Sequence, residues 1–257
     1  MNKVILISVD GMRPDGFLNC GNPFIHELMA NSTYTLTGRT VFPSVTLPCH
    51  LSLFHSIPPQ RHGTLTNTYM PPVRPVNGLF EQISNAGGTS AMFINWETLR
   101  QVASFSSLQH SAFIHAYTEE STDTINMERA AATIDRYHTD FVFLYMVETD
   151  EKGGHDNGWM SEEYLRRISI AMDNIKTMVE KYGDEYTIIV TADHGGHDRS
   201  HGTDMAEDMT IPMFFMGSAF EKGKEITDIS ILDIAPTIAH VMDVPCAHEW
   251  EGKTLTK

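Results

Sequence analysis

Acidic and histidine side chains follow three hydrophobic runs of the sequence, at the points where those runs end. Asp10, Asp150 and Asp193 each come at or just beyond such a run, and His194 is the neighbour of Asp193. Because ligands of a parallel sheet bind outside the carboxyl ends of its strands, we expect these side chains to share one site.

The oxygen and nitrogen donors near these positions have the chemistry of a metal centre. The candidate donors are Asp10, Thr46, Asp150, His155, Asp193, His194 and His201. Carboxylate and imidazole suit zinc and similar transition metals, and the absence of a cysteine cluster argues against a structural zinc ribbon. Two divalent ions roughly 3.5–4 Å apart would hold a phosphoryl group between them. We therefore expect two metal ions, Zn²⁺ first, with Mn²⁺ or Fe as the other candidates.

Composition excludes some classes of partner. A net charge of −15 over 257 residues argues against a protein that binds duplex nucleic acid, which needs a basic surface. It is compatible with a small anionic phosphate ester, such as a nucleotide, because bound cations reverse the local field. No apolar run reaches the about 20 residues that a membrane span needs. Nothing in the sequence indicates an oligomeric state.

The three cysteines, Cys20, Cys49 and Cys246, are odd in number and widely spaced. They contain no CxxC pair, and the N-terminus lacks the pattern of a signal peptide. A disulfide framework is therefore not expected, and a reducing cytoplasm is the expected location.

Strand-like and helix-like segments alternate along the chain. The expected strands are residues 4–9, 90–95, 141–147, 186–191 and 212–216. The expected helices are residues 24–29, 47–54, 79–86, 122–137, 231–242 and a segment from Ser161, as N-cap, to Gly183. This alternation predicts an α/β fold in which a mostly parallel sheet carries helices on both faces. Without a linker or an internal repeat, residues 1–257 are predicted to form a single domain.

Five motifs of the sequence resemble those of a known group, the alkaline phosphatase superfamily, in its nucleotide pyrophosphatase/phosphodiesterase branch. The matching segments, in the order of that family, are residues 7–13, 42–50, 150–155, 192–195 and 201–212. The resemblance implies an alkaline-phosphatase-like sandwich. It also implies a metal-dependent hydrolase of phosphodiester or nucleotide pyrophosphate bonds that works through a phosphothreonine intermediate.

Carried over residue by residue, the resemblance assigns roles to the donors. Thr46 matches the nucleophile of the family, which also bridges toward the metals. The implied ligands of one metal are Asp10, Asp193 and His194, and those of the other are Asp150, His155 and His201.

The sequence departs from the family pattern at two places. Cys49 stands where the family usually has the asparagine of Thr-x-Pro-Asn-His, so a weak donor occupies an expected substrate-binding position. The family commonly places its aspartate four residues before the histidine. Here that position before His155 is Glu151, while Asp150 is five residues away. We prefer Asp150, because it lies nearer the strand end and the two glycines at 153–154 can absorb the extra residue.

Other functions stay open at this stage. A phosphomonoesterase or phosphonate hydrolase of the same superfamily is the enzymatic alternative, and a degenerate, non-catalytic metal-binding protein is the other. A sulfatase is disfavoured, because no Cys/Ser-x-Pro-x-Arg motif surrounds the cysteines. Tyr69, Trp96 and Trp159 could stack on a base, although aromatic residues near loops more often edge a core.

Overall fold

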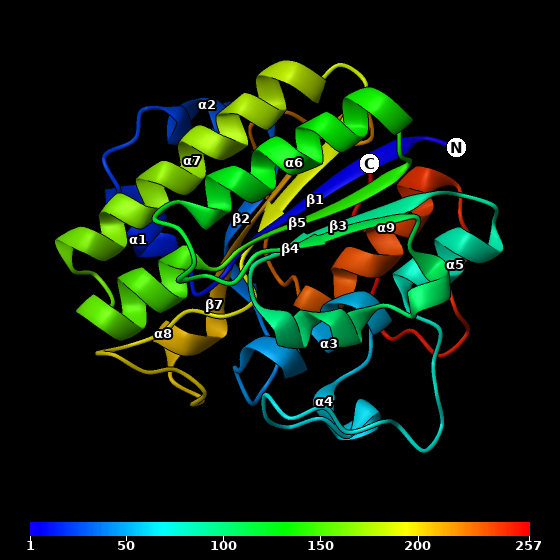
Figure 1. Ribbon diagram of the computed structural model, residues 1–257, viewed down its shortest axis with the longest axis horizontal. Helices are drawn as coiled ribbons and strands as arrows, with labels where there is room; N and C mark the ends of the chain where they lie inside the picture. Colours follow the sequence, from blue (N-terminus) through cyan, green and yellow to red (C-terminus); the bar gives the residue numbers. More distant parts are fainter.

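In the computed structural model, which describes residues 1–257, one eight-stranded sheet runs through the molecule (Figure 1). The strand order is β4-β3-β5-β1-β6-β7-β2-β8. The strands are β1 (Lys3–Val9), β2 (Thr33–Arg39), β3 (Ser90–Ile94), β4 (His110–Phe113), β5 (Phe141–Met146), β6 (Tyr186–Thr191), β7 (Thr210–Met216) and β8 (Lys224–Glu225). The five strands from β4 to β6 in this order are parallel, whereas β7 pairs antiparallel with both β6 and β2.

The centre of the sheet consists of strands that are apolar on both faces. Every residue of β5 is buried, as are all residues of β1 after Lys3. Such near-continuous apolar runs are typical of parallel strands covered by helices on both sides. The expected α/β class with a mostly parallel sheet is therefore confirmed.

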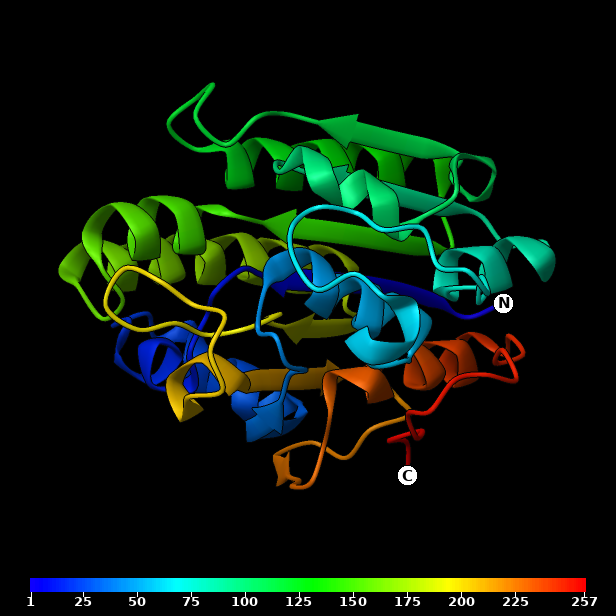
Figure 2. The same cartoon turned by 90° about the horizontal axis from the view of Figure 1, so that it is seen from below.

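Helices cover both faces of the sheet (Figures 1 and 2). One layer contains α1 (Pro14–Asn19), α2 (Phe24–Asn31), α6 (Thr122–Tyr137) and α7 (Glu162–Tyr182). The other contains α3 (Thr46–His55), α5 (Leu79–Asn85) and α9 (Ile234–Met242). The remaining helical segments are α4 (Pro59–His62), α8 (Ala206–Met209), the 3₁₀ turns η1 (Glu97–Val102), η2 (Phe105–Ser107) and η4 (Ile231–Asp233), and the π-helix η3 (Thr149–His155).

The long helices lie close to their expected positions. Residues 122–137 form α6 as predicted. Ser161 caps α7, since its hydroxyl accepts a hydrogen bond from the backbone N–H of Tyr164 at 3.2 Å. The first three residues of the last expected helix, from Ile231, form the 3₁₀ turn η4 instead.

Three strands, β2, β4 and β8, are absent from the predicted set. β4 and β8 are short edge strands, and β2 is interrupted by a bulge between Thr35 and Gly38. The bulge faces Pro212 of β7, which has no N–H to donate to a ladder. Such short or interrupted strands give little periodicity in a sequence.

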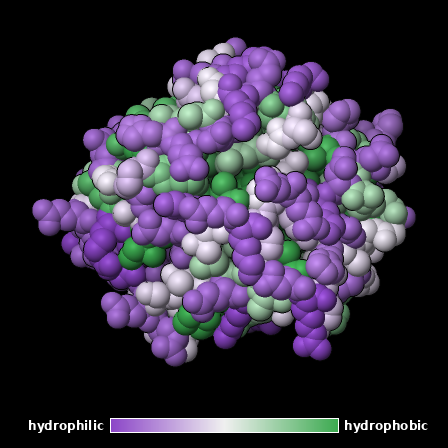
Figure 3. Space-filling view, turned by 90° about the horizontal axis from the view of Figure 1, so that it is seen from above, coloured by the Kyte–Doolittle hydropathy of each residue, from purple (hydrophilic) through white to green (hydrophobic).

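None of the helices combines the length and the apolar character needed to cross a lipid bilayer. The face shown in Figure 3 is mostly hydrophilic, with apolar side chains scattered over it. The buried apolar side chains form one continuous core on both sides of the sheet. The extent of a single domain over residues 1–257 stays a prediction.

Candidate metal centre and nucleophile

The strands β5, β1 and β6 are neighbours in the sheet, so the loops that follow them meet at one edge. Asp10 follows β1, Asp150 lies in the π-helix after β5, and Asp193 follows β6. All three carboxylates are buried, at 1%, 4% and 0% exposure. The fold thus gathers the three acidic side chains that were expected to share a site.

Asp10, Asp193 and His194 form the first group of candidate ligands. The Nε2 atom of His194 lies 3.3 Å from Oδ1 of Asp10 and 3.4 Å from Oδ2 of Asp193. The other carboxylate oxygens are held by the protein: the Tyr145 hydroxyl donates to Asp10 Oδ2, and the Gly11 N–H donates to Asp193 Oδ1 at 3.2 Å. One oxygen of each carboxylate is therefore directed at the shared space.

The second group joins Asp150 and His201 with His194. Oδ1 of Asp150 lies 3.9 Å from Nε2 of His201, and its Oδ2 lies 3.3 Å from Nε2 of His155. His155 therefore approaches the second oxygen of the same carboxylate. The rings of His194 and His201 stack with centroids 3.9 Å apart, so the two groups are contiguous.

Each of these histidines is tethered through Nδ1 to a backbone carbonyl. His194 bonds to Gly195 O at 2.8 Å, His155 to Arg199 O at 3.0 Å, and His201 to the carbonyl of Ser44 at 2.9 Å. In a neutral imidazole this bond places the proton on Nδ1 and leaves Nε2 as the acceptor, as is usual for histidines that bind metals.

One oxygen of each buried carboxylate is left without a hydrogen-bond partner. Asp10 Oδ1, Asp150 Oδ1 and Asp193 Oδ2 accept no hydrogen bond in the protein. Burial, together with the charges of Asp193 and Asp150, raises the pKa of Asp10 well above its usual value. Burying unpaired carboxylate charge costs free energy, which a bound cation would offset. The residues present therefore fit divalent cations.

The pKa values of two of the histidines are shifted in opposite directions. The hydrogen bond to Asp150 raises the pKa of His155 to about 9, whereas burial and then the neighbouring His194 lower the pKa of His201 to about 4. Without a cation, His155 therefore carries a proton at neutral pH. A cation bound there would have to displace that proton.

Thr46 is the first residue of α3, and its side chain is buried beside the acidic cluster. Its Oγ1 lies 3.1 Å from His194 Nε2. The Nδ1 atom of His50 bonds to the carbonyl of Thr46 at 2.9 Å and lies 3.4 Å from Asp193 Oδ2. The Thr46 hydroxyl thus lies beside the first group of ligands.

A π-helix accounts for the unusual spacing between Asp150 and His155. Residues 149–155 form η3, and a π-helix joins residues i and i+5 rather than i and i+4. Asp150 and His155 therefore face each other despite the extra residue. The Glu151 carboxylate instead accepts a hydrogen bond from Tyr117 at 3.2 Å, away from the cluster.

The structure places Cys49 inside α3 with no exposed surface. Its sulfur accepts a hydrogen bond from the Thr40 hydroxyl at 3.2 Å, and burial raises the pKa of the thiol. In this position the thiol is engaged within the protein. That Cys49 binds substrate stays a prediction, and the mechanism proposed below gives it no role.

Asn67 is a polar residue at this site that the sequence reasoning did not single out. Its Oδ1 accepts a hydrogen bond from the N–H of Leu47, next to Thr46, at 3.1 Å. Its amide Nδ2 has no partner within the chain. Asn67 lies 21 positions after Thr46, in an irregular loop, so no helical or strand periodicity links the two.

Two known families match the sequence. Residues 4–112 match the family described as type I phosphodiesterase / nucleotide pyrophosphatase, and residues 80–245 match the metalloenzyme superfamily. The chain belongs to the metalloenzyme superfamily. These matches confirm the resemblance to the alkaline phosphatase superfamily and to its phosphodiesterase branch, and the solved structures below show the shared fold.

A curated relative of the chain is a mutase, and it is a longer protein. The chain is 27% identical over 137 residues to a phosphopentomutase of Symbiobacterium thermophilum, a match that covers 53% of this chain and 34% of that protein. It spans about a third or less of the length of the first curated relatives it matches.

Solved structures share the fold. An inactive variant of murine ectonucleotide pyrophosphatase / phosphodiesterase 5, in complex with AMP, superposes with a TM-score of 0.81 at 16% identity, covering 96% of each chain. A protein of the alkaline phosphatase superfamily from Vibrio parahaemolyticus has a TM-score of 0.73 at 13% identity, covering 100% of this chain and 70% of that one. The expected alkaline-phosphatase-like fold is thereby confirmed.

Proposed function

We propose that this protein hydrolyses phosphodiester or nucleotide pyrophosphate bonds, with Thr46 as the nucleophile. The observation that carries the proposal is the Thr46 hydroxyl, which lies 3.1 Å from His194 beside three buried carboxylates whose inner oxygens are unpaired. Two divalent cations, when bound, would neutralise phosphoryl charge and lower the pKa of that hydroxyl.

The residues of the site have two kinds of role, holding the cations and attacking phosphorus. Asp10, Asp193 and His194 would hold one cation, and Asp150, His155 and His201 the other. Oγ1 of Thr46 loses its proton to solvent and bonds to phosphorus, while the bond from phosphorus to the leaving oxygen breaks. Water then cleaves the phosphothreonine and restores the hydroxyl.

Asn67 is proposed to bind a phosphoryl oxygen. Its carbonyl is fixed by the N–H of Leu47, which leaves the amide Nδ2 free beside Thr46. This would supply the amide donor that the family usually takes from the position of Cys49.

Basic side chains close to the site in sequence are engaged elsewhere. Arg13 pairs with Asp15 and bonds to the carbonyl of Gly196, and Lys152 pairs with the buried Glu148 at 2.7 Å. A phosphate diester carries one negative charge and a monoester close to two, so a monoester makes the larger demand for nearby positive charge. This favours a diester over a monoester as the substrate, and the AMP complex of the murine neighbour adds support for a nucleotide.

Turnover of three substrates tests this proposal. We expect the protein loaded with Zn²⁺ or Mn²⁺ to hydrolyse a bis-aryl phosphate faster than an aryl monophosphate, and to lose activity in chelator. Faster monoester turnover would assign the chain to the phosphomonoesterases, and preference for an aryl phosphonate monoester to the phosphonate hydrolases. No turnover of any of them, with metal bound, would indicate a non-catalytic metal-binding protein.

We predict that the protein binds two equivalents of divalent cation, because two contiguous groups of ligands are present. Binding should strengthen between pH 7 and pH 9, since the proton that His155 holds, with its pKa raised to about 9, must leave before a cation enters. Metal analysis and Zn²⁺ titration at several pH values check both points. A stoichiometry that stays at one after saturation contradicts the two-metal arrangement.

Replacing Asn67 by alanine should lower kcat by about 10²–10³-fold, the usual effect of removing one donor to a developing oxyanion. Metal content should not change, because Asn67 is outside both groups of ligands. Steady-state kinetics and metal analysis of the variant measure these effects. Thr66→Ala, in the same exposed loop, is the matched control and should keep the parental kcat. An Asn67→Ala variant with parental kcat would remove Asn67 from the mechanism.

A further inference from the structure

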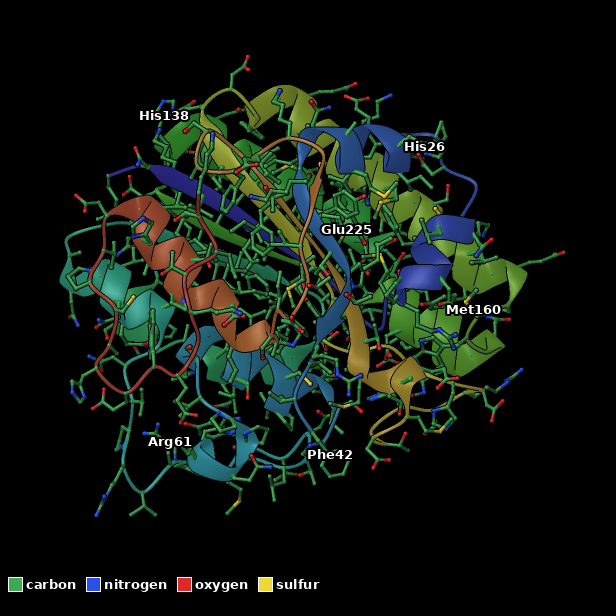
Figure 4. All side chains as sticks on the ribbon, turned by 180° about the vertical axis from the view of Figure 1, so that it is seen from behind. His26, Phe42, Arg61, His138, Met160 and Glu225 are labelled. Atoms are coloured by element: carbon green, nitrogen blue, oxygen red, sulfur yellow. The ribbon has the colours of Figure 1, made fainter.

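Trp159 lies between the π-helix η3 and α7, and its contacts reach every loop that carries a candidate ligand. Figure 4 labels the residue that follows it, Met160, between the start of α7 and α8. Trp159 is buried, at 7% exposure, so it is not a surface on which a substrate base could stack. The mechanism proposed above gives it no role.

Two hydrogen bonds tie Trp159 to the loops after β1 and β6. Its indole Nε1 donates to the carbonyl of Gly11, the residue after Asp10, at 3.0 Å. Its backbone N–H donates to the carbonyl of Asp198 at 2.8 Å, in the loop that runs from His194 to His201. The residue therefore joins the segments that carry both groups of ligands.

The indole ring is pressed against two glycines in the loops that carry ligands. A Cβ on Gly154, next to His155, would lie 2.6 Å from the ring, and a Cβ on Gly196 would lie 2.2 Å from it. Real Cβ atoms do not approach so closely, so only glycine fits at either position while the indole is in place. The ring is thus wedged between the loop after β5 and the loop after β6.

The same ring lies beside two of the candidate ligands. The His155 ring is 5.2 Å away, at an interplanar angle of 85°, and the His201 ring is 6.0 Å away at 63°. These edge-on contacts limit the rotation of both imidazoles. A shift of the indole would move them relative to Asp150, which both approach.

We infer that Trp159 is a positioning residue that sets the distance between the two cation positions by holding the loops after β1, β5 and β6 together. The inference rests on the proposed function, because it concerns the same site. Groups that orient metal ligands from outside commonly change metal affinity by 10- to 100-fold when they are replaced.

Zn²⁺ titration of the metal-free protein, followed by calorimetry and by tryptophan fluorescence, tests the inference. Trp159→Phe keeps an aromatic ring but loses the N–H and part of the wedge, and we expect it to bind the second equivalent of Zn²⁺ about 10- to 100-fold more weakly than the parent. Zn²⁺ should also change the emission of the parent, because Trp159 lies beside His155 and His201. That change should be absent from the variant.

Trp250→Phe is the matched control. Trp250 also donates its indole N–H to a backbone carbonyl, that of Asn77 at 2.9 Å, but this bond is not to a loop that carries ligands. This variant should keep both the parental Zn²⁺ affinity and the Zn²⁺-dependent change in emission.

Gly154→Ala is a second variant, which keeps Trp159 but pushes a methyl group into its ring. It should also lose affinity for the second equivalent, and it decides the question if Trp159→Phe does not fold. Parental Zn²⁺ binding in the folded variants would overturn the inference while leaving the proposed function intact. A parent protein that neither binds Zn²⁺ nor hydrolyses a diester would instead refute the proposed function itself.

Discussion

Replacing Thr46 by alanine should abolish hydrolysis of a phosphodiester, with a loss in kcat of about 10³-fold or more. The hydroxyl is the proposed attacking oxygen, and alanine has no oxygen or other nucleophilic atom in its side chain to replace it. Metal content should stay close to that of the parent, because three carboxylates and three histidines remain. Steady-state kinetics with a bis-aryl phosphate, together with metal analysis, measure both effects.

Thr46→Ser is the control for this prediction. It keeps the oxygen and removes only a methyl group, so appreciable activity should remain. Rapid acid quench followed by mass spectrometry of the intact chain should detect a phosphorylated form of the parent and of the serine variant, but not of the alanine variant. If the alanine variant turns over at nearly the parental rate, the nucleophile is a water molecule and the phosphothreonine mechanism is wrong.

The sequence predicts the centre of this fold well because burial leaves a strong pattern there. β1, β5 and β6 are buried on both faces, so each appears as an apolar run that ends near an aspartate. Parallel strands place those ends at one edge, which is why the clustering of Asp10, Asp150 and Asp193 could be expected without a structure. The resemblance to the family added the pairing of these carboxylates with particular histidines.

Other features depend on contacts that no local pattern records. β4 is a four-residue edge strand, and the bulge in β2 is explained only by the proline in the strand beside it. Asn67 comes to the start of α3 through an irregular loop, and the ring of Trp159 packs against Gly154 and against Gly196, which comes from a different loop. These positions are set by tertiary packing, which overrides local sequence preference.

The spacing of Asp150 and Glu151 from His155 leaves open which carboxylate lies beside the histidine, and the structure places Asp150 there. A regular α-helix would bring Glu151, four residues before His155, to the histidine face. The π-helix η3 brings Asp150 there instead, at 3.3 Å from His155 Nε2, while Glu151 bonds to Tyr117. The buried oxygen Asp150 Oδ1 has no other partner.

Asp150→Asn should therefore remove much of the metal binding and activity, because a carboxylate charge is lost next to a dication. At a free Zn²⁺ concentration 100 times the parental Kd, one bound ion stabilises the parent by about 2.7 kcal/mol. Most of that increment should be missing from the variant. Glu151→Gln is the matched change at the next residue, and it should keep nearly all of the increment, since its side-chain oxygen can still accept the hydrogen bond from Tyr117. Thermal unfolding of each variant with and without Zn²⁺, alongside diesterase kinetics, measures both predictions. If Glu151→Gln loses the metal-dependent stabilisation and Asp150→Asn retains it, the acidic ligand beside His155 is Glu151.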